Sequence, residues 1–351
     1  MNILVTGTAG FIGFHTAARL VKEGHFVLGI DSVNEYYDPN LKFSRLAHAG
    51  INTDEIEFSK IVAASNNTGY SFCRLNLEDE AGLKKIFEAV RFDMVVHLAA
   101  QAGVRYSLEN PRAYIDSNVY AFVNVIECCR HFGVKHLVYA SSSSVYGLND
   151  VLPFSTAHNT NHPISLYAAT KKSNELMAHT YSHLFDLPVT GLRFFTAYGP
   201  WGRPDMALFI FTKNIIEDKP IQLYNNGNMV RDFTYVEDIV EGITRVLIHP
   251  PAPNAEWKMS TGDTSSSSAA YKVYNIGNNS PVPLLDYVAA IEKAIGKKAI
   301  IELMPMQPGD VPAACSDVTD LMRDTGYKPD TTVEEGVRRF VEWYKEYYHV
   351  V

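Results

Sequence analysis

The chain has 351 residues, 46% of them hydrophobic, which suits a globular protein with one large domain or two modest ones. The formal net charge is −8 and both signs are interspersed, which argues against nucleic acid as a partner because nucleic-acid-binding proteins usually carry a basic patch. The four cysteines show no CxxC spacing, the N-terminus does not resemble a signal peptide, and no run approaches about 18 apolar residues, so we expect a cytoplasmic protein without a membrane partner.

The first half of the chain alternates short apolar runs with amphipathic segments. Helices are predicted at 11–23 and 113–132, among others, and strands at 2–6, 26–30, 71–76, 94–100, 136–142 and 189–195. This alternation predicts an α/β fold with a doubly wound parallel sheet of the Rossmann type. Because the strand-like runs are continuously apolar, we expect both faces of the sheet to be buried.

Other regions depart from this rhythm. Residues 32–70 are polar, include a short helix at 41–48, and are expected to form an insertion over the edge of the sheet. Later in the chain Pro, Gly and aromatic residues become denser, and we predict a surface loop at 261–269 and helices at 284–295 and 333–348.

The change of pattern suggests two domains. We expect residues 1–195 to form most of a nucleotide-binding domain, with 225–250 and 273–280 returning to it. Residues 196–351 are expected to form most of a smaller C-terminal α/β domain that binds substrate.

A glycine-rich turn follows the first predicted strand. Gly7, Gly10 and Gly13 have the spacing GxxGxxG, which permits a tight turn, close approach of a pyrophosphate, and close packing of the next helix. The second strand ends near Asp31, whose carboxylate would bind a ribose 2′-hydroxyl and repel a 2′-phosphate, so NAD is favoured over NADP. The alternative is a plain strand-to-helix turn with Asp31 exposed at a strand end.

A second chemical pattern is the YxxxK spacing of Tyr167 and Lys171. On a helix these two side chains share one face, and the lysine charge would lower the phenol pKa from its ordinary value near ~10, making a usable acid and base. The fifth predicted strand ends in four serines at 141–144, at the edge where such sheets bind ligands. The alternatives are a polar loop and a half-buried helical tyrosine.

With five further motifs the sequence resembles the extended short-chain dehydrogenase/reductases, specifically the nucleotide-sugar epimerases, over residues 1 to about 317. The similarity is greatest to bacterial and plant UDP-glucuronate 4-epimerases. The motifs are DSVNEYYD at 31–38, QAGVRYS at 101–107, SSSSVYG at 141–147, YGPWGRPDMA at 198–207 and RDFTY at 231–235.

This resemblance implies a tightly held NAD and three catalytic residues. Tyr167 would remove the 4-hydroxyl proton, Ser142 would polarise O4, and Lys171 would also hold the nicotinamide ribose. Asn76 stands where relatives commonly have aspartate, and Asn118 would lie beneath the cofactor in a binding or structural role. The implied cofactor contacts are Gly7, Gly10, Phe11, Ile12, Gly13, Asp31, Asn34, Asn76, Leu77, Ala99, Ala100, Gln101, Asn118, Tyr167 and Lys171.

The resemblance also implies a UDP-sugar site. Arg231 would bind the pyrophosphate, Gln222 and Tyr224 would flank the uracil, and Asp310 would lie at the ribose. A uronic acid carboxylate would need fixed donors, which this chain offers at Ser143, Ser144, Thr196 and Arg203. The implied substrate contacts are Arg105, Ser142, Ser143, Ser144, Thr196, Arg203, Gln222, Tyr224, Arg231 and Asp310. The alternatives are salt-bridged arginines, loop-packing serines and a surface turn.

The implied function is NAD-dependent epimerisation at C4 of UDP-glucuronate to UDP-galacturonate through a 4-keto sugar, with no metal. Two alternatives stay open: an epimerase of a neutral or N-acetylated UDP-hexose, and a non-catalytic NAD-binding regulator. Dehydratases and decarboxylases are disfavoured because Ser143 and Ser144 replace their acidic residues. Relatives dimerise through helices equivalent to 113–132 and 166–185, so a homodimer is expected.

Overall fold

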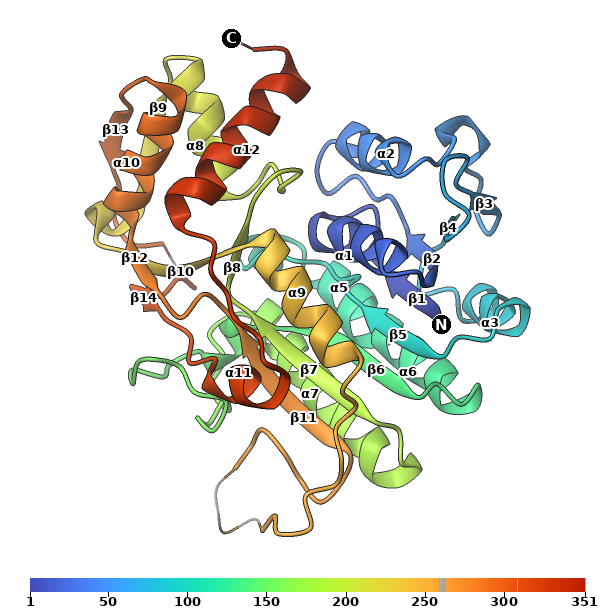
Figure 1. Cartoon of the computed structure of the whole chain (residues 1–351). Helices are drawn as coiled ribbons and strands as arrows, with labels where there is room; N and C mark the ends of the chain where they lie inside the picture. Colours follow the sequence, from blue (N-terminus) through green and yellow to red (C-terminus); the bar gives the residue numbers. More distant parts are fainter. Residues whose placement is uncertain (259, 261–262, 308, 351) are drawn as a thin grey trace.

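The computed structural model describes residues 1–258, 260, 263–307 and 309–350, so positions 261–262 of the predicted surface loop lie outside the described residues. An eight-stranded sheet forms the centre of the molecule, in the order β11-β7-β6-β5-β1-β2-β4-β3 (Figure 1). All its neighbouring strands are parallel except β3 and β4. The strands are β1 Asn2–Thr6, β2 Phe26–Asp31, β3 Ile61–Ala63, β4 Tyr70–Arg74, β5 Met94–His97, β6 His136–Ser142, β7 Val189–Phe194 and β11 Tyr271–Ile276.

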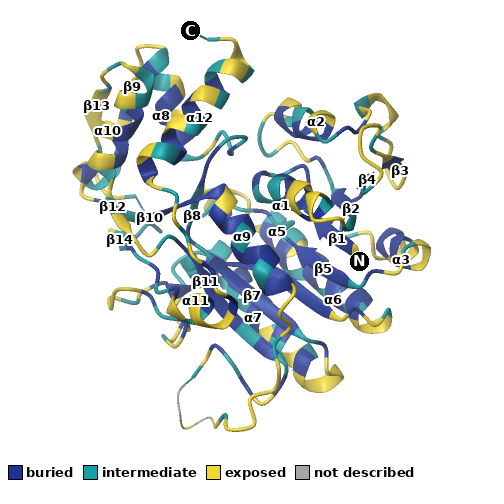
Figure 2. Ribbon diagram, viewed as in Figure 1, coloured by how far each residue is buried: buried dark blue, intermediate teal, exposed yellow. Residues whose placement is uncertain are grey.

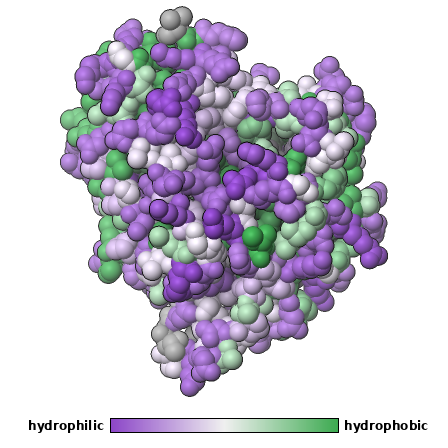
Figure 3. All heavy atoms as spheres, in the orientation of Figure 1, coloured by the Kyte–Doolittle hydropathy of each residue, from purple (hydrophilic) through white to green (hydrophobic). Residues whose placement is uncertain are grey.

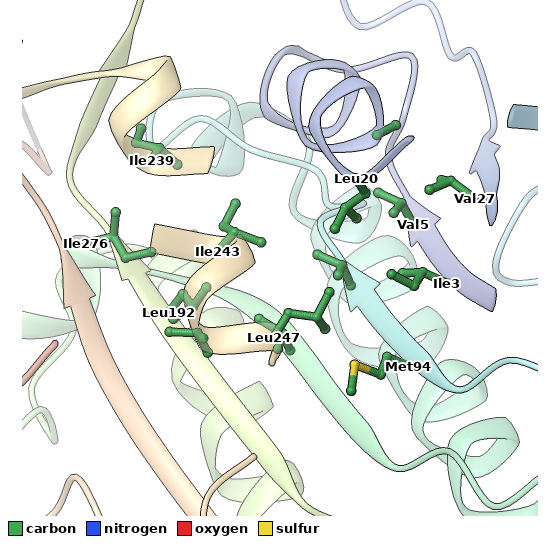
Figure 4. Close-up of a cluster of buried hydrophobic side chains, with 14 of the residues drawn as sticks. Ile3, Val5, Leu20, Val27, Met94, Leu192, Ile239, Ile243, Leu247 and Ile276 are labelled. Atoms are coloured by element: carbon green, nitrogen blue, oxygen red, sulfur yellow. The ribbon is translucent and has the colours of Figure 1, made fainter. Parts of the chain in front are cut away.

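Helices cover both faces of this sheet. Successive residues of β1 point to opposite faces: Ile3 and Val5 join one apolar cluster and Leu4 joins the other. The first face, shown in Figure 4, packs against α1 Phe11–Lys22, α9 Val236–Leu247 and α11 Thr319–Thr325. The second packs against α3 Glu80–Ala89, α6 Ala121–His131 and α7 Leu166–Phe185. Burial on both faces (Figure 2) confirms the predicted doubly wound sheet.

The polar segment 32–70 lies at the sheet edge, as expected. Its strand β3 pairs antiparallel with β4 and becomes the edge strand. Its helix α2, Pro39–His48, begins at Asp38, whose carboxylate accepts a hydrogen bond from the Asn40 N–H at 2.9 Å. A 3₁₀ turn at Thr53–Glu55 follows α2.

The single helix predicted at 113–132 is wrong in detail. The chain forms α4 Tyr106–Glu109, α5 Pro111–Ile115, a π-helical turn Asp116–Tyr120, and then α6. The π turn carries Asn118, whose Oδ1 accepts from the Gln101 N–H at 2.8 Å and whose Nδ2 donates to the Gln101 carbonyl at 3.0 Å. These two hydrogen bonds stabilise the π-helical turn, which an amphipathic sequence pattern does not predict.

The C-terminal part forms a second layer with its own apolar cluster, at the upper left of Figure 1. Strand β10 is its centre and pairs with β12, β14 and β8, while β9 pairs with β13. Phe233 and Tyr287 stack at 3.7 Å between ring centroids inside this layer. The elements are β8 Thr196–Tyr198, α8 Ala207–Ile216, β9 Pro220–Leu223, β10 Val230–Tyr235, β12 Pro281–Pro283, α10 Leu284–Ile295, β13 Ile300–Leu303, β14 Ala313–Ala314 and α12 Val333–Tyr348, with a 3₁₀ turn at Tyr224–Gly227. A further 3₁₀ turn, Ser143–Tyr146, directly follows β6 of the central sheet.

The face of the molecule seen in Figure 3 is largely hydrophilic, with apolar residues in small groups. Within the ranges that the structure describes, no helix is long and apolar enough to cross a membrane. The same ranges contain no group of three or more His, Cys, Asp or Glu side chains arranged to hold a metal ion.

Candidate active site

A cavity of about 990 Å³ lies at the carboxyl ends of the central strands, between the sheet and the C-terminal layer. This is the edge where doubly wound sheets bind ligands. Nearly all the site residues predicted from the sequence line it: Gly7, Gly10, Phe11, Ile12, Gly13, Asp31, Asn34, Leu77, Ala99, Ala100, Gln101, Arg105, Ser142, Ser143, Ser144, Tyr167, Lys171, Thr196, Arg203, Gln222, Tyr224, Arg231 and Asp310.

Two predicted cofactor residues do not line the cavity. Asn76 is exposed just after β4 and lies outside the lining. Asn118 is 1% exposed and sits behind Gln101, where its amide ties the π turn to the chain after β5 and also donates to Thr170 Oγ1 at 3.1 Å. In this structure Asn118 therefore supports a lining residue rather than facing the cavity.

The glycine-rich turn has the geometry that a dinucleotide pyrophosphate needs. Gly7 has φ +79°, and a Cβ there would lie 2.8 Å from the Ala99 nitrogen. A Cβ on Gly13 would lie 2.1 Å from the Gly7 carbonyl oxygen, so α1 packs directly on the turn. Helix α1 begins at Phe11 without a side-chain cap, which leaves its first backbone N–H groups at the cavity wall.

Asp31 stands beside this turn at the end of β2. Its carboxylate accepts from the Ala9 N–H at 3.1 Å and from the Val33 N–H at 2.8 Å. A carboxylate has about four acceptor positions, so capacity remains for ribose hydroxyls. Lys42, which the sequence reasoning missed, also lines the cavity and donates to the backbone oxygen and Oδ1 of Asn34 at 2.8 and 2.6 Å. The uncapped helix start and Asp31 together fit NAD.

Tyr167, Lys171 and Ser142 converge on the same cavity. Helix α7 begins after Ser165, whose hydroxyl accepts from the Ala168 N–H at 3.1 Å and fixes the first turn that carries Tyr167. The Ser142 hydroxyl lies close enough to the Tyr167 phenol to lower its pKa, and the Tyr114 ring packs edge-on against Tyr167 at 6.0 Å between centroids. Four residues on, Lys171 is only 2% exposed.

The protonation of these groups differs from the sequence expectation. Burial raises the pKa of Tyr167, and the opposing effects come from the Ser142 hydrogen bond and the charge of Arg203. Burial also lowers the pKa of Lys171 to about 8, because a charged ammonium is costly in an enclosed site. The protein by itself therefore does not show the expected lowering of the phenol pKa by Lys171, and it favours a neutral Tyr167.

A buried ionic network, also missed from the sequence, lies behind these residues. Glu175, two turns after Tyr167 on α7, accepts from Ser141 Oγ at 2.8 Å. It also accepts from Arg193 Nε and Nη2 at 2.8 and 3.0 Å, and both charged side chains are 0% exposed. Burial alone would raise the pKa of Glu175, but the charge and hydrogen bonds of Arg193 bring it down to about 2. The network joins β6, α7 and β7 beneath the cavity.

On the opposite wall, Arg203 forms an ion pair with Asp205, with Nε 3.0 Å from Oδ1. The Tyr36 hydroxyl donates to the other oxygen of Asp205 at 3.1 Å. Tyr36 comes from the polar segment at the sheet edge and was not assigned a role from the sequence. Arg203 remains 21% exposed at the cavity.

The far end of the cavity carries the residues expected at a nucleotide. Arg231 Nη2 donates to Asp310 Oδ1 at 2.7 Å, and Arg105 Nη2 lies 4.0 Å from Asp310 Oδ2. Gln222 Nε2 donates to Glu302 Oε2 at 3.0 Å, and the Tyr224 hydroxyl donates to Gln222 Oε1 at 3.0 Å. Glu302 was missed because its strand β13 meets β9 only in the folded chain.

The chain was compared with known proteins. Residues 3–277 match the model of the NAD dependent epimerase/dehydratase family. A probable UDP-glucuronate 4-epimerase from Rhizobium meliloti (strain 1021) is 49% identical and covers 99% of this chain and 98% of the relative.

Two solved structures are similar over the whole chain. The UDP-glucuronic acid 4-epimerase from Bacillus cereus, in complex with UDP-glucuronic acid and NAD, is 30% identical with a TM-score of 0.81, and covers 99% of this chain and 100% of that one. The UDP-glucose 4-epimerase from Thermotoga maritima, with UDP-glucose, is 27% identical with a TM-score of 0.81 and the same coverage. The chain therefore belongs to the NAD-dependent epimerase/dehydratase family and is an NAD-dependent enzyme with a Rossmann-type fold.

Proposed function

We propose that the chain is an isomerase that inverts C4 of a UDP-linked uronic acid, interconverting UDP-glucuronate and UDP-galacturonate. One observation carries the proposal: a single cavity is lined by Tyr167, Ser142, the glycine-rich turn and Arg203. The names of the Rhizobium meliloti and Bacillus cereus relatives support the same substrate.

In this mechanism NAD supplies reversible hydride transfer, and the chain supplies the proton and the positioning. As the phenolate, Tyr167 takes the proton from the 4-hydroxyl and becomes a neutral phenol, and it later returns this proton; the Ser142 hydroxyl donates a hydrogen bond to O4. Lys171, enclosed beside them, supplies an ammonium group whose charge favours the phenolate while the proton is away. The sugar turns between the two transfers, so each face of C4 is presented once.

A 4-keto uronic acid is a β-keto acid and can lose CO₂ when its carboxylate bond aligns with the ketone. The hydroxyls of Ser143, Ser144 and Thr196 and the guanidinium of Arg203 line the cavity and would fix that carboxylate out of alignment. No glutamate stands at 143 or 144, so the lining offers no acid there for decarboxylation or dehydration.

The nucleotide would lie along the far end of the cavity. Arg231 and Arg105 place two positive charges around Asp310, and a diphosphate would share them. Gln222 and Tyr224 would flank the base, with Glu302 orienting the Gln222 amide.

A neutral UDP-hexose is the second candidate substrate. It is favoured by one observation, that Arg203 already has a carboxylate partner in Asp205. A side-by-side comparison of UDP-glucuronate and UDP-galactose as substrates separates the two candidates, because a faster reaction of UDP-galactose would favour the neutral sugar. The third reading, a non-catalytic regulator, is disfavoured because both Tyr167 and Lys171 are present and line the cavity.

The direct test is incubation of the purified protein with UDP-glucuronate and no added NAD, followed by ¹H NMR. We expect UDP-galacturonate to accumulate to a constant ratio, because retained NAD is regenerated in each cycle. Absence of UDP-galacturonate from protein that still contains NAD contradicts the proposal.

We also propose a homodimer. Several large apolar side chains are exposed along α4–α7, where two copies would bury them against each other: Leu108, Ile115, Tyr120, Leu176 and Leu184. Of these helices, α6 and α7 cover the face of the sheet opposite α1 and α9.

A further inference from the structure

The segment 32–70 lines the cavity with Asn34, Tyr36 and Lys42, and it also carries a fully buried guanidinium. Arg45, on α2, is 0% exposed. Its Nη1 donates to the Ala9 carbonyl and to the Tyr37 hydroxyl, both at 2.7 Å. Its Nε and Nη2 donate to the Trp201 carbonyl at 3.2 and 2.6 Å, and Nη2 also lies 3.4 Å from the Gly202 oxygen.

The carbonyl partners of Arg45 are chain neighbours of residues on the two walls of the cavity. Ala9 lies inside the glycine-rich turn, and its own N–H donates to Asp31. Trp201 and Gly202 directly precede Arg203 on the opposite wall. One side chain that does not itself line the cavity thus connects the cofactor turn to the loop that presents a substrate-binding arginine.

The Trp201 backbone gives an independent reason to regard this contact as specific. Trp201 has φ +62°, in the left-handed region that bulky residues rarely adopt, at a cost of about 1–3 kcal/mol. Two N–H groups of Arg45 bind the carbonyl of this strained residue. The loop is therefore kept in a conformation that its own sequence does not favour.

The chemistry of the contact requires arginine. A buried cation is costly unless its donors are satisfied, and among the described residues Arg45 forms no ion pair with a carboxylate. Its planar fork reaches carbonyls on both walls at fixed angles, whereas the single ammonium of lysine cannot bind both sets at once.

Other contacts of the same segment point the same way. The Tyr347 hydroxyl on α12 donates to Ser44 Oγ at 2.8 Å, and the His48 and Trp201 rings lie 5.4 Å apart between centroids. With the Tyr36 contact to Asp205, side chains of the segment meet residues from the later part of the chain in several places.

We propose that Arg45 is a positioning residue that fixes the Trp201–Arg203 loop relative to the cofactor turn, and so couples NAD retention to sugar binding. The effect of Arg45 on NAD retention does not depend on the proposed substrate, whereas its effect on sugar binding rests on the proposed function. Segment 32–70 is then a bridge between the two walls of the cavity.

The test compares Arg45→Lys with the parent holoenzyme, using two measurements. The first is the rate of NAD loss on dilution, with and without UDP-glucuronate at about 1 mM, a concentration at the upper end of typical KM values. The second is KM and kcat for epimerisation. We expect Arg45→Lys to lose NAD at least about 10-fold faster than the parent. Its KM should rise at least about 5-fold, while kcat stays within about 3-fold. UDP-glucuronate should also slow NAD loss less than it does in the parent, because a coupling of about 1–3 kcal/mol between the two sites is lost. Arg19→Lys is the matched control, because Arg19 is 43% exposed and pairs only with surface glutamates, and it should leave all these quantities unchanged.

The inference is overturned if folded Arg45→Lys keeps the parental NAD loss rate and KM, or if only its thermal stability falls. It is also overturned if NAD retention or KM changes without the other. Should Arg45→Lys not fold, Tyr37→Phe removes one acceptor of Arg45, and the same two quantities must shift in the same direction by a smaller factor. If the parent does not epimerise UDP-glucuronate, the proposed substrate fails, while NAD loss with and without UDP still tests the role of Arg45.

Discussion

At the cavity, the Arg203 guanidinium can pair with either of two carboxylates: that of Asp205, which it contacts, or that of a bound uronic acid. Asp205 is also held by the Tyr36 hydroxyl, so it keeps a hydrogen-bond donor if the guanidinium turns toward substrate. Burial disfavours the Arg203 charge, and the charge of Asp205 more than offsets it, which raises the pKa of Arg203. The guanidinium therefore stays charged in either arrangement.

We predict that Arg203→Met raises KM for UDP-glucuronate by about 10- to 100-fold, since hydrogen bonds to charged groups contribute about 1.5–3 kcal/mol. KM for UDP-galactose should change less than about 3-fold in the same steady-state assay, because a neutral sugar offers no carboxylate. The matched control is Arg338→Met, which removes an arginine that is 50% exposed on α12. Equal losses for the two sugars would show that Arg203 does not select a uronic acid.

Residue-scale prediction from sequence succeeds where spacing alone places a side chain. Tyr167 and Lys171 share a helix face, and Gly7 and Asp31 follow strand ends, so their meeting at one sheet edge can be inferred from the pattern. Arg45, Glu175 and Arg193 could not be identified, because their partners are distant in sequence and are brought near only by tertiary packing. For Arg193 one signal was available, since it is a charged residue within a predicted apolar strand.

At the scale of elements, the buried Glu175–Arg193 pair determines how β6, α7 and β7 meet. Ser141, which donates to Glu175, directly precedes Ser142 at the end of β6, while Tyr167 lies two turns before Glu175 on α7. The Glu175 carboxylate thus connects the strand that ends at Ser142 with the helix that carries Tyr167.

We predict that Glu175→Gln lowers the free energy of unfolding by about 3–5 kcal/mol, because it leaves the Arg193 charge buried without its partner. Urea denaturation followed by circular dichroism measures this change, and kcat should fall as Ser142 and Tyr167 move apart. Glu127→Gln on α6 is the control, since its surface pairs are worth less than about 1 kcal/mol. A loss for Glu175→Gln no larger than that of the control would contradict this account of the network.

The sequence predicted most elements of the sheet because continuous apolar runs fix buried parallel strands. It predicted one helix at 113–132, and the π turn at Asp116–Tyr120 escaped because the hydrogen bonds of Asn118 to Gln101 depend on the folded sheet. The function of segment 32–70 was also hidden, since its contacts are with the C-terminal layer.

For the whole molecule, three histidines link stability to pH: His97 and His136, which are buried, and His15, which is half-buried. Burial lowers the pKa of His15 to about 4, of His97 to about 3 and of His136 to about 4, from an ordinary value of 6.5. Below pH 6.5 the unfolded chain binds protons that the folded chain does not bind until pH is near these lower values. The free energy of unfolding therefore falls as pH decreases from 6.5 toward 4.

We predict a loss of roughly 2 kcal/mol for each such histidine at pH 5 relative to pH 7. Urea denaturation at the two pH values measures the sum. His136→Asn should reduce the difference, because it removes one of the titrating rings at a site where both nitrogens are hydrogen-bonded. Equal stability at pH 5 and pH 7 would contradict the assignment of these rings as neutral.

The proposed homodimer is a second whole-molecule property. We predict that Leu176→Glu combined with Leu184→Glu yields a monomer by light scattering after size-exclusion chromatography, because it places charge on two apolar side chains that are each 60% exposed. Leu303→Glu on β13, 57% exposed away from these helices, is the control and should stay dimeric. A parent protein that is already monomeric would exclude the dimer.

The central claim is that the Tyr167 hydroxyl exchanges the proton of the sugar at C4, beside bound NAD. The most direct measurement is the epimerisation rate of Tyr167→Phe, made together with its NAD content. We predict a rate at least about 100-fold lower than that of the parent, within the range of general acid–base effects, and an unchanged amount of NAD per chain. A Tyr167→Phe variant that interconverts the two UDP-uronic acids at the parental rate would contradict it.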